Sequence, residues 1–513
     1  MENGNNLSNI SYFKRIIMLS LLFFKLGIVN FGGGYALLPL LSKELVDKRG
    51  WTTDKELADY YAVGQCTPGA IAVNVSTFIG YKIAGILGGI LATLFFVLPS
   101  FIIIFIVATV LVNFNDNPYV VNALAGINVV VFVLILSAIV KLSKNSIVDI
   151  WTLLIALTVL FLSVFVSAIP LYVYVIVAAI LGFFINMIKE KKEFKIEAKE
   201  SSMIEKAEER KGLVSENKND ITKKDVLMFI FGTITGLLIG LFGFVICLFI
   251  KNKKFKNGLI VTTFLWLIMF VCTIITVIMK DGLLFSEYFH FFRIGICAFG
   301  GGLATFPFLE ELGTMTGWFT EEELTAMLAV SESTPGAMGI NMSTYVGYTA
   351  TLGEYNNYFL AFIGSMITTL GLVTPSIIII LLVSLFLDKF NNNKYVKWVF
   401  YGLRAASIGL ICAAAYSVLK VSVFNKIDGG SGHYDIISAF NATKDYFKAN
   451  GGANFFSSIY KYIEYLINFK ALAVCAIFTI LVFKFKKHSI VYIALGGLVG
   501  ILLQMGNVGL WVF

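Results

Sequence analysis

The chain has 513 residues, of which 58% are hydrophobic and only 14% are charged. Soluble domains carry about 25% charged residues, and the mean hydropathy here is +0.83. The composition therefore excludes a soluble globular protein and predicts an all-α polytopic membrane protein. The net charge of +8 does not indicate nucleic-acid binding, because much of the lysine lies in one stretch of mixed charge, 189–225.

Apolar runs of about 20 residues, long enough to cross a bilayer core, recur along the chain. In the first half they are predicted near 14–38, 83–112, 119–141, 148–167 and 169–188. In the middle and second half they are predicted near 226–250, 258–280, 283–306, 358–388, 396–420, 470–486 and 489–511. The total is about 12 spans. Two further apolar segments, 57–80 and 324–347, are rich in glycine, proline and serine, so we expect broken or re-entrant helices there.

These spans divide the chain into four predicted parts. Residues 1–188 form a first transmembrane repeat, and 189–225 form a charged cytoplasmic linker. Residues 226–281 add two spans, and 282–513 form a second repeat with a long polar loop at 421–469. The N-terminus leads through Lys14 and Arg15 directly into the first span, which does not fit a cleavable signal peptide.

The two repeats are visible as matching sequence. "FFKLGIVNFGGG", from Phe23, matches "FFRIGICAFGGG", from Phe291, at an offset of 268 positions. "QCTPGAIAVNVSTFIGY", from Gln65, matches "ESTPGAMGINMSTYVGY", from Glu332, at an offset of 267. Agreement of this density predicts a duplicated unit.

The loops between matching segments predict that the repeats are inverted. The first-half loop "SKELVDKRGWTTDKEL" carries four basic residues, whereas its counterpart "EELGTMTGWFTEEEL" carries none. Cytoplasmic loops carry an excess of Lys and Arg, so the first loop is expected inside and the second outside. The C-terminus is then expected outside.

Broken helices leave backbone groups unpaired, and in lipid these groups survive only inside protein or beside a wet cavity. Paired broken segments in two inverted halves therefore predict a transport site near mid-membrane, where exposed helix N-termini favour anions. The expected oxyanion ligands are backbone groups of the glycine triplets and TPGA segments, side-chain donors and two cations: Gly32, Gly33, Gly34, Gly300, Gly301, Gly302, Pro68, Gly69, Pro335, Gly336, Asn74, Thr77, Asn341, Thr344, Lys25 and Arg293. A third cation, Arg404, lies in the apolar run "YGLRAASIGL". Glu332, which we expect to be the only buried acid, is the candidate for proton coupling.

Structural alternatives remain open for these residues. A glycine triplet can simply permit close helix packing, and Lys25 and Arg293 can be interfacial anchors. Asn74, like Thr77, can cap a helix or satisfy freed carbonyls, and Glu332 can be a capping acid. No metal site or cofactor is expected, because the six cysteines lie in apolar contexts without a CxxC pair and the three histidines are scattered.

At these residues the sequence resembles the chromate ion transporter (CHR) family, in its long two-repeat form. The resemblance rests on Phe31 to Gly34, Pro39, Trp51, Gln65, Pro68 and Gly69, and on their partners in the second half. The chain departs from the family pattern at Ala70 and Ala337, where the last proline of a P-G-P motif is missing, and at Glu332, where a glutamine is expected. The resemblance implies chromate efflux driven by the membrane potential or a proton gradient.

We therefore expect a secondary active transporter of a small inorganic oxyanion, chromate or sulfate, in the cell (inner) membrane. The lipid bilayer and the oxyanion are the expected partners, nucleic acid is not expected, and a homodimer stays open. One rival is a transporter or channel for another solute: a monovalent anion, an organic acid, or a cation coupled through Glu332. The other rival, a membrane-embedded enzyme, would need a cluster of catalytic residues inside the spans, and the sequence contains no such cluster.

Overall fold

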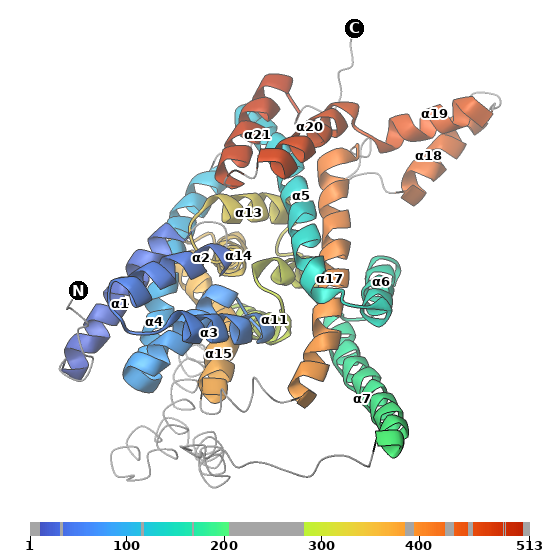
Figure 1. Cartoon of the computed structure of the whole chain (residues 1–513). Helices are drawn as coiled ribbons and strands as arrows, with labels where there is room; N and C mark the ends of the chain where they lie inside the picture. The colour runs from blue at the N-terminus through green and yellow to red at the C-terminus, as the bar shows by residue number, and fades with distance from the viewer. Residues whose placement is uncertain are drawn as a thin grey trace.

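The structure is a computed structural model of the whole chain (Figure 1). It describes residues 11–30, 34–113, 117–166, 169–204, 282–384, 394–425, 436–449, 455–485, 487 and 489–505. The two predicted middle spans and most of the predicted linker lie outside these residues. Within them the chain is helical, and strand pairing is limited to two isolated bridges.

The first half begins with a helix that is interrupted after Val29 and resumes at Gly34. Its elements are α1 (Tyr12–Val29), α2 (Gly34–Leu41), a π-helical turn (Ser42–Asp47), α3 (Asp54–Cys66), α4 (Ile71–Asn113), α5 (Pro118–Ser146), α6 (Ile150–Phe165) and α7 (Leu171–Ile204). α4 is two helices in one run, because Ala84 and Gly85 leave helical geometry. α7 continues beyond 188 into the stretch predicted as linker.

The second half repeats this order. Its elements are α11 (Leu283–Cys297), a 3-10 turn (Gly302–Thr305), α12 (Phe306–Thr316), α13 (Glu321–Ser333), α14 (Met338–Tyr355), α15 (Tyr358–Ser384), α17 (Lys394–Val423), α18 (Ile436–Ala449), α19 (Phe455–Leu466), α20 (Phe469–Phe485) and α21 (Ser489–Leu503). α3 and α13 begin with the same capping box, formed by Thr53 with Glu56 and by Thr320 with Glu323. The stretch predicted as a polar loop contains α18 and α19, a hairpin that projects from the bundle in Figure 1.

Five described helices are long and apolar enough to cross a membrane. They are found at Ile71–Leu111, Pro118–Lys144, Leu171–Glu190, Tyr358–Ser384 and Lys394–Val423. The prediction of an all-α membrane protein is therefore confirmed. The number of spans and the inverted orientation of the repeats remain predictions.

The second part of α4, after Gly85, packs against its counterpart, α15, and the two helices run in opposite directions. Near the start of that part, an added Cβ at Gly89 would lie 2.9 Å from the Leu381 side chain, late in α15. Further along, the Phe105 ring lies 5.3 Å from the ring of Phe362, early in α15. Corresponding helices of the two halves are therefore antiparallel at this contact.

α5 and α17 are also counterparts, and they cross in the same antiparallel sense. The offset that aligns Ser100 with Ser376 also aligns Pro118 with Lys394, the first residues of the two helices. Near the end of α17, Ser422 Oγ donates to the Asn128 carbonyl oxygen, early in α5, at 3.0 Å.

Helices of the first half pack closely against helices of the second half at glycine residues. Gly126 of α5 meets Gly496 and Gly500 of α21, and Gly182 of α7 meets Gly402 of α17. Figure 1 accordingly shows α5, from the first half, beside α17, α20 and α21 of the second. Small residues let helix backbones approach in this way where lipid supplies no hydrophobic driving force.

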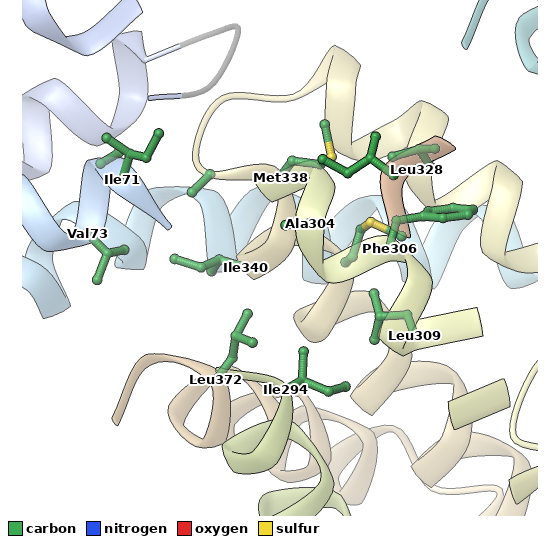
Figure 2. Packing of buried hydrophobic residues seen from close by; sticks show 14 of the residues in the cluster. Ile71, Val73, Ile294, Ala304, Phe306, Leu309, Leu328, Met338, Ile340 and Leu372 are labelled. Atoms are coloured by element: carbon green, nitrogen blue, oxygen red, sulfur yellow. The ribbon is translucent and has the colours of Figure 1, made fainter. Parts of the chain in front are cut away.

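The interruption between α1 and α2 is called the first break, and the interruption between α11 and the 3-10 turn at Gly302 is called the second break. A continuous apolar core fills the space around the second break. Figure 2 shows Ala304 and Phe306, which follow the break, near Met338 and Leu328 of α14 and α13. Ile71, at the start of α4, belongs to the same buried cluster. Both halves therefore contribute side chains to one core that surrounds the broken segments.

Candidate functional site

Each half contains a sharp corner made by its Thr-Pro-Gly segment. In the first half the corner joins α3 to α4 and Gly69 has φ +93°; in the second it joins α13 to α14 and Gly336 has φ +112°. Only glycine adopts such values without strain, which explains its place in both corners. The predicted helix breaks at 57–80 and 324–347 are present, as two helices that meet at a corner.

A buried asparagine holds each corner closed. Asn74 Nδ2 donates to the carbonyl oxygens of Gly64 and Pro68 at 3.1 and 3.0 Å, and to Thr67 Oγ1 at 3.0 Å. Asn341 Nδ2 donates to the Pro335 carbonyl oxygen at 3.0 Å and to Thr334 Oγ1 at 3.1 Å. The amide groups thus satisfy carbonyls that the break set free. A direct contact between either amide and an anion stays a prediction.

Thr77 and Thr344 join helices within their own half. Thr77 Oγ1 lies 2.6 Å from Thr93 Oγ1 in the second part of α4, and Thr344 Oγ1 lies 2.8 Å from Thr369 Oγ1 of α15. Each hydroxyl also donates to a backbone carbonyl one turn earlier. All four hydroxyls are buried, so a role in anion binding would require the two helices that each pair joins to separate.

Each corner forms a backbone hydrogen bond with the opposite repeat. The Gly69 N–H donates to the carbonyl oxygen of Ala298, at the end of α11, at 2.8 Å. The Gly336 N–H donates to the carbonyl oxygen of Asn30, at the end of α1, also at 2.8 Å. Pro68 and Phe299 form an isolated bridge at the same place. Each corner therefore lies directly against the helix break of the other half.

The glycine breaks are partly described. Gly300 and Gly301 have φ +103° and +100°, so the helix that ends at Cys297 cannot continue through them. The chain resumes as a 3-10 turn at Gly302. The interruption predicted here is confirmed. Gly32 and Gly33 lie outside the described residues, and Gly34 begins α2.

The two predicted cations form ion pairs across their own breaks. Lys25 Nζ, on α1, lies 3.5 Å from Glu44 Oε1, and Arg293 Nη2, on α11, lies 3.7 Å from Glu311 Oε2, on α12. Lys48 and Arg49 also bond Glu44, and these bonds lower the pKa of its carboxyl to about 2. The Lys25 side chain is 65% exposed, as the anchor alternative expects. Their part in anion binding stays a prediction.

The burial of the acidic residues differs from the expectation in one respect. Glu332 lies half-buried in the last turn of α13, at the position that corresponds to Gln65 in α3. Glu323 caps α13, and α14 has no side-chain cap, so the capping alternative for Glu332 finds no support. The expectation that Glu332 is the only buried acid is wrong. Glu287 of α11 is fully buried and accepts a hydrogen bond from Thr351 Oγ1 at 2.8 Å.

A cavity of about 30 Å³ lies between the second break, the end of α3 and α17. Its lining includes Gln65, Gly300, Arg404, Ser407 and, from the end of α5, Ser146. Arg404 was visible in the sequence as a charge inside an apolar run, but nothing in the sequence placed it beside Gln65 and Gly300. No cluster of potential metal ligands occurs among the residues that the structure describes.

Comparison with known proteins agrees with this architecture. The model of the chromate transporter family matches residues 17–183 and 285–501. An uncharacterized transporter of Methanocaldococcus jannaschii is 24% identical over 417 residues, which cover 80% of this chain and 85% of the relative. A chromate transport protein of Pseudomonas aeruginosa is 23% identical over 413 residues, covering 78% and 80%.

A shorter match is closer in sequence. A chromate transport protein of Cupriavidus metallidurans is 33% identical over 139 residues, covering 27% of this chain and 34% of the relative. No solved structure matches the chain. All three relatives are named as transporters or transport proteins, so the similarity is to transporters and not to enzymes. With its family match across both repeats, the chain belongs to the chromate transporter family.

Proposed function

We propose that the chain is a secondary active transporter of a small inorganic oxyanion, with its site at the interface of two inverted repeats in the cell (inner) membrane. Chromate is the first candidate substrate, because relatives bear that name. Sulfate is the second, because both are tetrahedral dianions. The membrane potential or a proton gradient drives transport.

The observation that carries this proposal is the pair of reciprocal bonds from Gly69 to Ala298 and from Gly336 to Asn30. These bonds bring the broken helix of each half against the corner of the other. Non-helical backbone at membrane depth is tolerated only where protein buries it or where it lines a cavity. A small cavity adjoins the second break, which supports a site for a small solute rather than a larger organic acid.

The inverted orientation is supported by the antiparallel contacts. The second part of α4 corresponds to α15, and both belong to helices that are long and apolar enough to cross a membrane. Corresponding spans that pack antiparallel run through the bilayer in opposite directions, as inverted repeats require. The unequal basic charge of the matching loops supports the same orientation.

Uptake of radiolabelled chromate and sulfate into proteoliposomes tests the function, with and without an imposed pH gradient and membrane potential. We expect saturable uptake for which the two anions compete, and a dependence on at least one gradient. Glu332→Gln is expected to retain oxyanion binding and to lose dependence on the pH gradient, because the variant cannot carry a proton. If folded protein takes up neither anion while a monovalent anion or an organic acid enters saturably, the substrate assignment is wrong.

A further inference from the structure

The cavity at the second break has the chemistry of an anion site. Among the described residues that line it, Arg404 is the one charged side chain, and Gln65, Ser146 and Ser407 supply neutral polar groups. An arginine presents five N–H donors in a fork that matches oxyanion oxygens, and it stays charged at any physiological pH. The lining, as far as the structure describes it, contains no carboxylate that would repel an anion.

The first half does not reproduce this chemistry at the matching place. Asn128 of α5 corresponds to Arg404 of α17, and Glu332 corresponds to Gln65. Ser422 is the counterpart of Ser146. Its hydroxyl donates a hydrogen bond to the Asn128 carbonyl oxygen, and both residues are buried. One interface therefore has a cavity lined by a cation and a glutamine, whereas the corresponding positions of the other carry a buried asparagine and a carboxylate.

The open cavity lies at the basic end of the bundle. Leu142 and Ser146 line it from the last turns of α5, which also carry exposed Lys141 and Lys144. Beside it, Tyr401 of α17 donates to Asp149 at 2.6 Å, and Lys189 of α7 forms an ion pair with the same carboxylate. The excess of lysine at this end indicates the cytoplasmic side, and it would attract anions towards the opening.

We propose that this cavity is the cytoplasm-facing binding site of the transported oxyanion, with Arg404 as its charged ligand and Gln65 as a neutral one. At the corresponding positions of the other half, Asn128 supplies no charge and Glu332 supplies a carboxylate. The two halves thus contribute unequally to the anion site. This inference rests on the proposed function and adds to it the residue that recognises the anion and the face from which the anion enters.

Oxyanion uptake as a function of concentration tests the assignment, measured as labelled sulfate entering proteoliposomes. Arg404→Gln removes the charge and keeps a polar side chain, and Arg404→Lys keeps the charge without the fork. Loss of a charge-assisted hydrogen bond is expected to raise KM roughly tenfold to a hundredfold in Arg404→Gln, with partial recovery in Arg404→Lys. Asn128→Ser is the matched control at the corresponding position, and its KM is expected to stay that of the wild type.

A second measurement gives the face and does not depend on turnover. Ser146→Cys, in protein with its native cysteines replaced, is expected to react with a membrane-impermeant maleimide in inside-out vesicles and not in intact cells. Added sulfate or chromate is expected to slow this reaction in the Arg404 protein and not in the Arg404→Gln protein. Size-exclusion profiles establish that each variant is folded.

The outcomes separate the two proposals. Saturable wild-type uptake with an unchanged KM in folded Arg404→Gln overturns the assignment of Arg404 and leaves the transport function standing. Labelling of Ser146→Cys from the outside overturns the assigned face. Absence of oxyanion uptake by folded wild-type protein overturns the proposed function, and this inference with it.

Discussion

Gln65 and Glu332 occupy the same position at the ends of α3 and α13, and Asn128 and Arg404 occupy the same position on α5 and α17. Around these pairs the two halves are nearly identical: the same corner glycine, the same asparagine clamp, the same threonine pair. The shared residues form hydrogen bonds within the protein that hold the fold. The differing residues lie at the open cavity or its counterpart, so the difference indicates where the two halves divide their functions.

The largest expected effect on stability comes from substituting the corner glycines, which both halves share. A side chain at Gly69 would collide with Ser376, and one at Gly336 would collide with Ser100, in each case across the repeat interface. Overpacking and backbone strain together are expected to cost about 3 kcal/mol or more in Gly69→Val and in Gly336→Val. Thermal melting with size-exclusion analysis checks this. Gly353→Ala, on a helix with open space around it, is the control and is expected to be neutral.

The asparagine clamps are expected to have the next largest effect. Asn74→Ala and Asn341→Ala leave buried carbonyls unpaired, at a cost of about 2–4 kcal/mol in each half. Melting temperature and substrate KM should be measured on the same preparations. A normal melting temperature with a strongly raised KM would mean that the amide binds the anion instead of holding the corner.

The ion pairs across the breaks sharpen the comparison in a different way. Alanine at both Lys25 and Arg293 is expected to lower oxyanion uptake roughly tenfold, because it removes a cation from each helix that ends at a break. Lys25→Ala alone is expected to change stability by about 0–1 kcal/mol, since its side chain is mostly exposed. Unchanged uptake in the double variant would remove both cations from the site.

The smallest effect concerns acid stability and belongs to the first half alone. The Glu44 carboxyl has a pKa of about 2 in the folded protein, lowered from 4.5 by Lys48 and Arg49. A lowered folded pKa means that its contribution is full above pH 4.5 and is lost as the pH falls towards 2. Glu44→Gln should therefore lower the melting temperature at pH 7 and reduce its fall between pH 5 and 3. An equal fall in melting temperature between pH 5 and 3 for the wild type and Glu44→Gln would contradict this.

Much of the architecture could be predicted from the sequence, because its signals are local. Apolar length predicted the five helices that are long enough to cross a membrane, and glycine and proline predicted the breaks near Gly300 and at the two corners. The helices of the 421–469 stretch were missed, since its composition is that of a polar loop. The burial of Glu287 was missed as well, because one acid in an apolar run does not reveal which face of the helix it occupies.

The arrangement of the candidate site depends on contacts between distant segments. The bonds from Gly69 to Ala298 and from Gly336 to Asn30 join residues more than two hundred positions apart, and no periodicity or motif predicts such pairs. For the same reason the sequence showed Arg404 as an unusual charge but did not place it beside Gln65. The packing of the two halves brings these residues together.

The opposed orientation of the two halves is the claim on which the site and its cationic cavity depend. Its most direct test is the labelling of single cysteines in matching loops with a membrane-impermeant maleimide. Lys43→Cys and Met315→Cys are suitable, because both residues are exposed and lie in the segments that follow the two breaks, Lys43 in the π-helical turn and Met315 near the end of α12. In intact cells Met315→Cys is predicted to react and Lys43→Cys to react only after permeabilisation. Reaction of both positions from the same side would contradict the inverted arrangement.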